Sequence, residues 1–261
     1  MFKGKKFNVR KMTIAGVLGG LSIILGLTPI GIIPIGFTKA TIMHIPVIIG
    51  AIMEGPVVGS FIGLIFGLSS IYSAIMQPTP VSFAFYNPLV SVVPRILIGI
   101  TSYYVYKALS RMGNKKTLVF LNVIWIAIIG YLSYGIYSSI SGSGSGWQLV
   151  MNIILIVLTA AMAYITNKKF GNKALDIIIA SIVGTMTNTG LVLGLIYLIY
   201  AEDFVKALGL DTALAGKIIT GIGITNGIPE TILAIIIVTS VVSALKKRDS
   251  AVGGSLEKSQ K

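Results

Sequence analysis

The sequence has 261 residues, of which 54% are hydrophobic and 11% charged, with a mean hydropathy of +0.90. Soluble domains usually carry about a quarter charged residues, so this composition excludes a large soluble core and indicates a polytopic membrane protein. The formal net charge is +13, but the basic residues gather in short segments between apolar runs, which is typical of cytoplasmic loops rather than of a nucleic-acid-binding surface. Because the chain has no cysteine, a thiolate metal site and a disulfide framework are both excluded.

In chain order, the apolar segments predict eight membrane spans, since a spanning helix needs about 20 mostly apolar residues. The predicted spans are residues 12–30, 41–53, 57–76, 87–108, 118–138, 148–166, 174–200 and 222–245. The second is short, and Glu54-Gly55-Pro56 after it has the composition of a tight turn. The basic N-terminus resembles that of a signal peptide, but no small-residue cleavage site follows, so we interpret it as the start of the first span.

Basic residues predict the orientation of these spans. They occur in the N-terminus, after the fourth span, after the sixth span and in the C-terminus: Lys3, Lys5, Lys6, Arg10, Lys11; Lys107, Arg111, Lys115, Lys116; Lys168, Lys169, Lys173; Lys246, Lys247, Arg248. All four groups fall on one side if every span crosses once, and the positive-inside rule then places both termini in the cytoplasm. We therefore expect a single transmembrane domain over residues 1–245 and a polar cytoplasmic tail over residues 246–261.

One arginine, Arg95, lies inside an apolar run, eight residues into a predicted span that starts outside. A charge at that depth costs several kcal/mol and usually faces a cavity or a partner. One interpretation is a structural ion pair with Glu230, and the other is a counter-charge for an anionic substrate. The two are compatible, because Glu230 could hold Arg95 in place.

Other polar side chains are predicted at the same outer depth, on four separate segments. With Arg95 they form the candidate substrate-binding set: His44, Asn87, Asn188, Asn226 and Glu230. Each has a structural alternative, namely an interfacial histidine, a helix cap or a hydrogen bond between helices. An apolar pocket with a few convergent polar groups is, however, the usual form of a small-molecule site.

Small residues recur every fourth position in two spans. In the third span they are Gly55, Gly59, Gly63 and Gly67, and we expect this stripe to pack within the monomer. In the first span Ala15 and Gly19 have the same spacing, as do Gly16 and Gly20. There the alternative to internal packing is docking to another membrane subunit.

Several motifs occur together: AxxxG in the first span, LTPIGIIPIGFTKATIMHIP, EGPVVG, FYNPLVSVVPRILIG, GTMTNTGLVLGLIY and TNGIPE. As a set they resemble the substrate-binding S component of an energy-coupling factor (ECF) transporter, over residues 10–110 and 174–245. The resemblance implies a six-helix, multi-pass protein of the bacterial plasma membrane that captures a vitamin from outside. It also implies association with a transmembrane scaffold subunit and two ATPases, docking through Ala15 and Gly19, and a lid near residues 27–40.

The sequence departs from the six-helix pattern at residues 117–170, where we expect an inserted pair of spans at the periphery. The resemblance is closest to pantothenate-type S components, and a carboxylate substrate fits Arg95. Folate is also anionic, and riboflavin would use stacking aromatic residues such as Phe83, Phe85 and Tyr86.

Two other classes of function compete with this interpretation. A stand-alone secondary transporter usually needs inverted repeats and ion-coupling acids at mid-membrane, and no clear repeat is present in the sequence. An intramembrane enzyme would need a metal cluster or a nucleophile with its base, but His44 is the sole histidine. No GxxxxGK[ST] phosphate loop occurs either, so we expect no enzyme activity, no metal and no cofactor, with ATP used by partner subunits.

Overall fold

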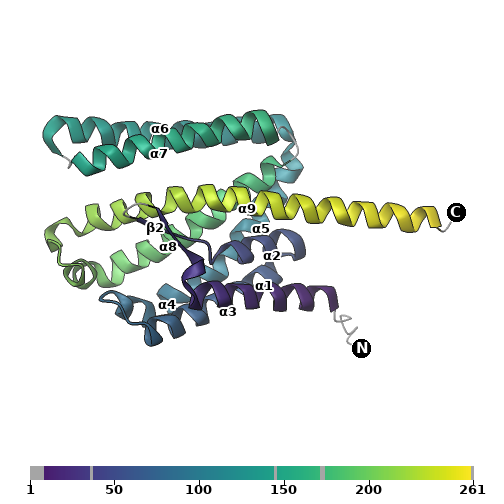
Figure 1. The fold of residues 1–261 in the computed structure, drawn as a ribbon, viewed down its shortest axis with the longest axis horizontal. Helices are drawn as coiled ribbons and strands as arrows, with labels where there is room; N and C mark the ends of the chain where they lie inside the picture. Colours follow the sequence, from purple (N-terminus) through teal and green to yellow (C-terminus); the bar gives the residue numbers. More distant parts are fainter. Residues whose placement is uncertain (1–8, 36–37, 144–145, 171–173, 260–261) are drawn as a thin grey trace.

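The computed structural model describes residues 9–35, 38–143, 146–170 and 174–259, which form a bundle of long helices (Figure 1). In chain order the elements are α1 (Val9–Leu27), η1 (Pro29–Gly31), β1 (Ile32–Ile35), β2 (Thr38–Thr41), α2 (Ile45–Glu54), α3 (Pro56–Met76), η2 (Ser82–Tyr86), α4 (Pro88–Ser91), α5 (Val93–Met112), α6 (Asn114–Ser138), η3 (Ser139–Ser143), α7 (Gly146–Ile165), η4 (Thr166–Phe170), α8 (Leu175–Ala207), η6 (Thr212–Leu214) and α9 (Ala215–Ser259). Within these ranges, seven helices are long and apolar enough to cross a membrane. The predicted all-α polytopic class is therefore confirmed, with one short β-hairpin as a local exception.

The second predicted span, residues 41–53, differs from a full membrane helix. The antiparallel hairpin β1–β2, in which Ile32 lies opposite Thr41, comes first, and α2 follows with ten residues. At 1.5 Å per residue α2 covers about 15 Å, half of the hydrocarbon core. The hairpin and α2 together return the chain, so both termini lie at the same end of the bundle, on the right of Figure 1.

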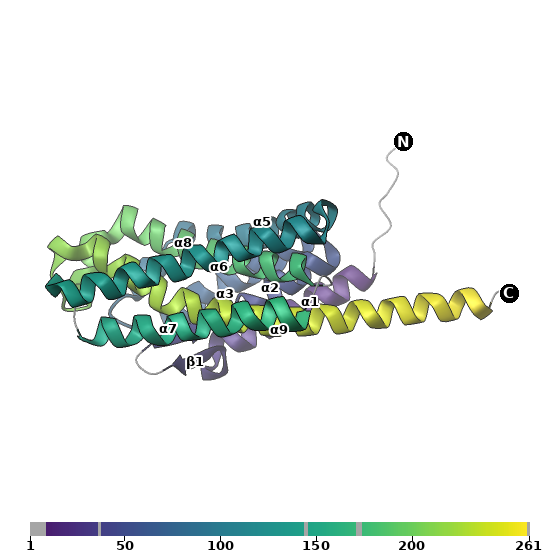
Figure 2. The same ribbon diagram turned by 90° about the horizontal axis from the view of Figure 1, so that it is seen from above.

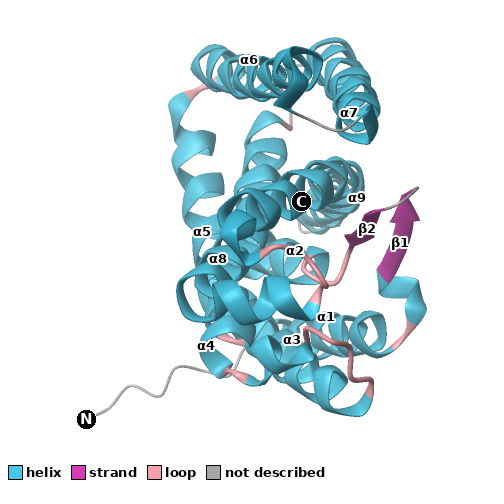
Figure 3. Ribbon diagram, turned by 90° about the vertical axis from the view of Figure 1, so that its left-hand side faces the viewer, coloured by secondary structure: helices cyan, strands magenta, loops and turns pink. Residues whose placement is uncertain are grey.

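The helices α6 and α7 form an outer pair. They pack against one another and reach the rest of the bundle through α5, α8 and α9, and the end-on view of Figure 3 shows them as a separate layer above these three helices. Buried apolar side chains such as Leu121 and Trp125 of α6 join Ile178 of α8 and Ile235 of α9 in one cluster. The pair therefore lies away from α1, α2 and α3.

The predicted fourth span, residues 87–108, is broken into two helices. Pro94 has no N–H to donate to the carbonyl of Val90 four residues earlier, and this loss weakens the helix at this point. The chain forms α4, breaks at Val92 and begins again as α5. Arg95 thus lies in the first turn of α5 rather than inside a continuous helix, and its Nη1 donates to the Val90 carbonyl at 2.5 Å.

Gly59, Gly63 and Gly67 of the predicted stripe pack within the monomer, whereas Gly55 precedes α3 and a Cβ atom there would meet nothing within 4 Å. A Cβ atom on Gly63 would overlap the backbone carbonyl of Arg95, and one on Gly67 would lie 2.7 Å from the Cα of Val92. One on Gly59 would lie 3.0 Å from the Cα of Gly99. The α3 backbone therefore rests directly on α5 and fixes the position of the Arg95 main chain.

We expect Gly63→Ala to lower the free energy of unfolding by about 1–3 kcal/mol, because the new methyl group would force α5 away from α3. Thermal unfolding of the purified protein in detergent would measure the change. Gly16→Ala is the matched control, since a Cβ on Gly16 meets nothing within 4 Å. Equal stability of the two variants would contradict the close approach of α3 and α5.

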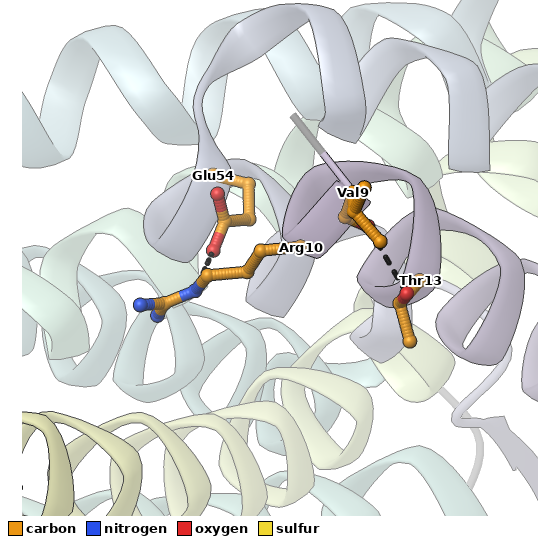
Figure 4. Close-up of polar contacts among 4 residues, drawn as sticks. All are labelled: Val9, Arg10, Thr13 and Glu54. Carbon is orange, nitrogen blue, oxygen red and sulfur yellow. Dashed lines mark hydrogen bonds and ion pairs between the residues drawn. The ribbon is translucent and has the colours of Figure 1, made fainter. Parts of the chain in front are cut away.

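Polar contacts join the helices at the end of the bundle that holds both termini. Arg10 of α1 forms an ion pair with Glu54 at the end of α2, with 3.0 Å between Nε and Oε1 (Figure 4). Lys246 of α9 donates to the hydroxyl of Tyr106 near the end of α5. The helix α9 continues beyond the bundle to Ser259 (Figure 2), where the sequence predicted only a polar tail.

Candidate functional site

One face of α8 organises the candidate site. Thr185, Asn188 and Thr189 have the spacing i, i+3 and i+4, which places them on neighbouring turns of the same helical face. Thr185 and Asn188 are buried. The Thr185 side chain meets His44 from the segment before α2, and the Thr189 side chain meets Glu230 of α9.

His44 immediately precedes α2 and is fully buried. Its Nε2 lies 3.0 Å from Oγ1 of Thr185, so the histidine is tied to α8. Its Nδ1 has no hydrogen-bond partner among the described residues. This nitrogen is therefore available to a ligand.

Arg95 is 5% exposed and lies with its guanidinium carbon 5.4 Å from the ring centroid of Phe66, a cation–π contact with α3. Within the described part of the chain, no carboxylate oxygen lies within 4.0 Å of a nitrogen of Arg95. The ion pair that the described residues form joins Arg10 and Glu54. The direct ion pair with Glu230, which was one of the two interpretations of Arg95, is thus not formed. Nε of Arg95 is left without a partner.

Glu230 follows Pro229 in α9 and is 5% exposed. Its Oε1 accepts from the backbone N of Thr41 at 2.9 Å and from the Thr41 hydroxyl at 2.7 Å. Its Oε2 accepts from the hydroxyl of Thr189 at 3.0 Å. Both carboxylate oxygens are therefore engaged by the protein.

Two asparagines complete the polar layer. Asn188 lies one residue before Thr189, and its Oδ1 is buried without a partner in the described part of the chain. Asn226 lies one turn before Glu230 on the same face of α9 and is half-buried. Because Pro229 lacks an N–H, the carbonyl of Thr225 also loses its usual donor within the helix.

The structure thus leaves three buried polar atoms of this layer unpaired: Nδ1 of His44, Nε of Arg95 and Oδ1 of Asn188. Leaving a buried polar group unpaired costs about 1–3 kcal/mol, and such groups in native proteins call for a functional explanation. A small polar ligand between α5, α8 and the start of α2 would provide the missing partners.

Asn87, the remaining member of the predicted set, has structural partners. Its Oδ1 caps α4 by accepting from the backbone N of Leu89 at 3.0 Å. Its Nδ2 donates to the hydroxyl of Tyr200 at 3.2 Å, at a residue where α8 departs from helical geometry. The structure therefore gives Asn87 the helix-capping role that was the alternative for Asn226.

The predicted docking residues Ala15 and Gly19 are buried in α1, which is the internal packing that was the alternative to docking. Ala15 is buried in the main apolar cluster, and a Cβ on Gly19 would lie 2.7 Å from Cδ1 of Ile65 in α3. The second stripe of α1 faces outward instead, because Cβ atoms on Gly16 and Gly20 would meet nothing within 4 Å. Of the two stripes, this is the one open to another subunit.

Four residues of the layer were not in the predicted set: Thr41, Phe66, Thr185 and Thr189. Both α8 threonines stand beside Asn188 in GTMTNTG, and the i, i+3, i+4 spacing was available as a signal. Thr41 and Phe66 have no such signal, since their contacts depend on how β2 and α3 meet the bundle.

A sequence model described as "ECF transporter, substrate-specific component" matches the chain in two segments, residues 10–151 and 147–242. The chain belongs to this family. It is therefore the substrate-specific component of a transporter rather than an enzyme, and a multi-pass protein of the bacterial plasma membrane.

Two curated proteins are similar to this S component. The "Pantothenic acid transporter PanT" of Lactococcus lactis subsp. cremoris is 28% identical over 223 residues, covering 80% of this chain and 79% of its own. The "Pantothenate transporter PanT" of Leuconostoc mesenteroides subsp. mesenteroides is 38% identical over 77 residues, covering 29% of this chain and 37% of its own.

Proposed function

We propose that this S component binds pantothenate from outside the cell and delivers it inward as part of an ATP-driven importer. The observation that carries the proposal is the buried guanidinium of Arg95, which has no ion-paired carboxylate in the described part of the chain. A buried cation in a membrane segment is costly without a counter-charge. The carboxylate of a substrate would supply that charge.

Pantothenate matches the unpaired groups in its chemistry as well as in its charge. Its carboxylate accepts hydrogen bonds, as Nε of Arg95 requires, and its amide N–H and hydroxyl groups donate, as Oδ1 of Asn188 requires. His44 Nδ1 can serve either kind of group, depending on its tautomer. The names of the two similar proteins, both pantothenate transporters, support the same substrate.

Folate and riboflavin are the alternatives among vitamins, and a secondary transporter is the alternative mechanism. A flavin ring calls for aromatic stacking, yet Phe83 packs edge-on against Tyr200, with 5.6 Å between ring centroids. Folate shares the carboxylate chemistry, so it is the stronger competitor. The family assignment disfavours a stand-alone secondary transporter.

For energy coupling we infer a complex with one transmembrane scaffold subunit and two ATPases, which would use the ATP. The termini-bearing end of the bundle would face the cytoplasm, because basic residues such as Arg10, Arg111 and Lys246 gather there. The Gly16–Gly20 stripe of α1, where an added Cβ atom would meet nothing within 4 Å, would contact the scaffold. The pair α6–α7 would be an insertion into a six-helix core, and its outer position, where its main contacts with the other long helices are to α5, α8 and α9, supports this.

A panel of vitamins tests the proposal on the purified protein in detergent. Calorimetry or thermal shift would follow binding of pantothenate, folate, riboflavin, thiamine, biotin and pyridoxine in the absence of ATP. We expect tight, saturable binding of pantothenate and none of the others. Tight binding of folate instead would overturn the substrate, and silence across the panel would overturn the vitamin class.

A further inference from the structure

His44 is held by contacts of both its backbone and its ring. Its carbonyl accepts the backbone N–H of Ile48 at 3.3 Å, at the start of α2. Ile48 in turn packs onto α8, since a Cβ atom on Gly184 would lie 2.9 Å from the Cδ1 atom of Ile48. The next residue of α8, Thr185, places its Oγ1 3.0 Å from Nε2 of His44. The imidazole is therefore fixed against one point of α8, while its Nδ1 has no partner among the described residues.

The surroundings of His44 favour a neutral imidazole. The residue is fully buried, and within the described ranges no Asp or Glu oxygen lies within 4.0 Å of its ring nitrogens. A buried cation without such a partner is costly. A neutral imidazole carries one proton, on either Nδ1 or Nε2, so one nitrogen donates and the other accepts.

The hydroxyl of Thr185 differs from neighbouring hydroxyls of α8. Ser181 and Thr187 each donate to the backbone carbonyl four residues earlier in the helix, both at 2.8 Å. Thr185 makes no such bond, and in the described part of the chain the ring of His44 is the hydrogen-bond partner of its hydroxyl. The O–H proton of Thr185 is therefore available to Nε2 of His44.

Two arrangements of protons are compatible with this contact, and they differ in the groups that they leave unpaired. If Thr185 donates to Nε2, the ring proton lies on Nδ1, and the Nδ1–H group alone lacks a partner among the described residues. If Nε2–H donates to Thr185 instead, both the threonine O–H and the lone pair of Nδ1 lack one. Unpaired buried polar groups destabilise a protein, so the first arrangement is the more stable in the ligand-free protein.

We propose that Thr185 is a positioning residue that fixes the tautomer of His44, so that Nδ1–H donates a hydrogen bond to an acceptor oxygen of the substrate. The inference rests on the proposed function for the identity of that substrate. Pantothenate has such oxygens in its carboxylate and in its amide carbonyl. With Nε–H of Arg95, the polar layer then offers two unpaired donors, which favours a substrate rich in acceptor oxygens.

Magic-angle-spinning NMR of the ligand-free protein in lipid vesicles tests the tautomer directly. His44 is the sole histidine of the sequence, so ¹⁵N-histidine labelling, with a purification tag that contains no histidine, reports on this ring alone. We expect a protonated Nδ1 and an unprotonated Nε2 in the wild type, loss of this preference in Thr185→Val, and its return in Thr185→Ser. Thr187→Val is the matched control, because the Thr187 hydroxyl bonds Val183 and Thr101 rather than His44.

Binding then connects the tautomer to the substrate. Pantothenate should shift the Nδ1–H resonance of the wild type, and Thr185→Val should bind it about tenfold more weakly, with Thr185→Ser within about threefold of wild type. The uncharged alcohol pantothenol keeps the amide of pantothenate and lacks its carboxylate. A resonance that moves with pantothenate alone would assign the acceptor to the carboxylate, and one that moves with both ligands would assign it to the amide carbonyl.

Three results would overturn the proposal. They are a proton on Nε2 in the ligand-free wild type, a tautomer that Thr185→Val leaves unchanged, and pantothenate binding without any change at Nδ1 of His44. If the wild type bound no vitamin, the proposed function would fail, and the spectra of the ligand-free protein would still decide the tautomer.

Discussion

Replacing Arg95 by glutamine should weaken pantothenate binding by about 100-fold or more, while binding of pantothenol changes only a few-fold. Truncating one partner of a buried charge pair commonly costs 2–5 kcal/mol, and 100-fold corresponds to about 2.7 kcal/mol. Pantothenol carries a hydroxymethyl group where pantothenate carries its carboxylate, so it cannot form this pair. Calorimetry with both ligands on both proteins gives the comparison directly.

Arg111→Gln is the matched control for Arg95→Gln, because Arg111 is exposed in the last turn of the same helix. It should bind both ligands as the wild-type protein does. An equal loss of pantothenate and pantothenol in Arg95→Gln would mean that Arg95 supports the fold through Val90 and Phe66. Unchanged affinity for pantothenate would remove Arg95 from the site.

The polar layer could be predicted from the sequence because charge in a membrane is scarce. Depth along the spans brought His44, Arg95, Asn188 and Glu230 to one level, and the structure gathers these four between the start of α2, α5, α8 and α9. Depth alone could not say which polar atoms are paired. Pairing with Glu230 was one of two interpretations of Arg95, but the Glu230 carboxylate accepts hydrogen bonds from two threonine hydroxyls and a backbone N–H instead.

Other features depend on which face of a helix meets its neighbour, and spacing does not define that. Ala15–Gly19 and Gly16–Gly20 differ by one residue, or about 100° around the helix, and only the packing of α1 on Ile65 distinguishes them. The hairpin could not be predicted either, because the Gly- and Pro-rich segment before α2 has the composition of a turn and no clear alternation of apolar and polar residues. The break at Pro94, by contrast, follows from a rule that the sequence already contained.

Arg95 and Glu230 are both buried, yet each is compensated by different neighbours. Arg95 has a carbonyl and an aromatic face, and Glu230 has three donors. A direct buried ion pair would satisfy both residues and leave little for a substrate to add. Separate compensation keeps part of the guanidinium unpaired, and under the proposed function this would favour an anionic substrate.

Leucine at both Gly16 and Gly20 should leave pantothenate binding within about twofold of wild type and lower uptake by cells at least tenfold. Both positions are open in the monomer, and leucine favours a helix by about 1 kcal/mol over glycine, so the isolated protein should fold normally. Two bulky side chains would, however, prevent the close helix–helix approach that small residues allow. Calorimetry of the purified protein and uptake of labelled pantothenate by cells with the scaffold and ATPases measure the two effects.

The control for this expected loss of uptake without loss of binding comes from α8. Gly190 and Gly194 have the same four-residue spacing and also open surroundings, so leucine at both positions adds the same bulk on another surface. We expect that variant to bind and take up pantothenate normally. If it lost uptake as well, bulk on any surface would be harmful. If the α1 variant kept full uptake, the scaffold would dock on a different face, and the exposure of Gly16 and Gly20 would reflect contact with lipid alone.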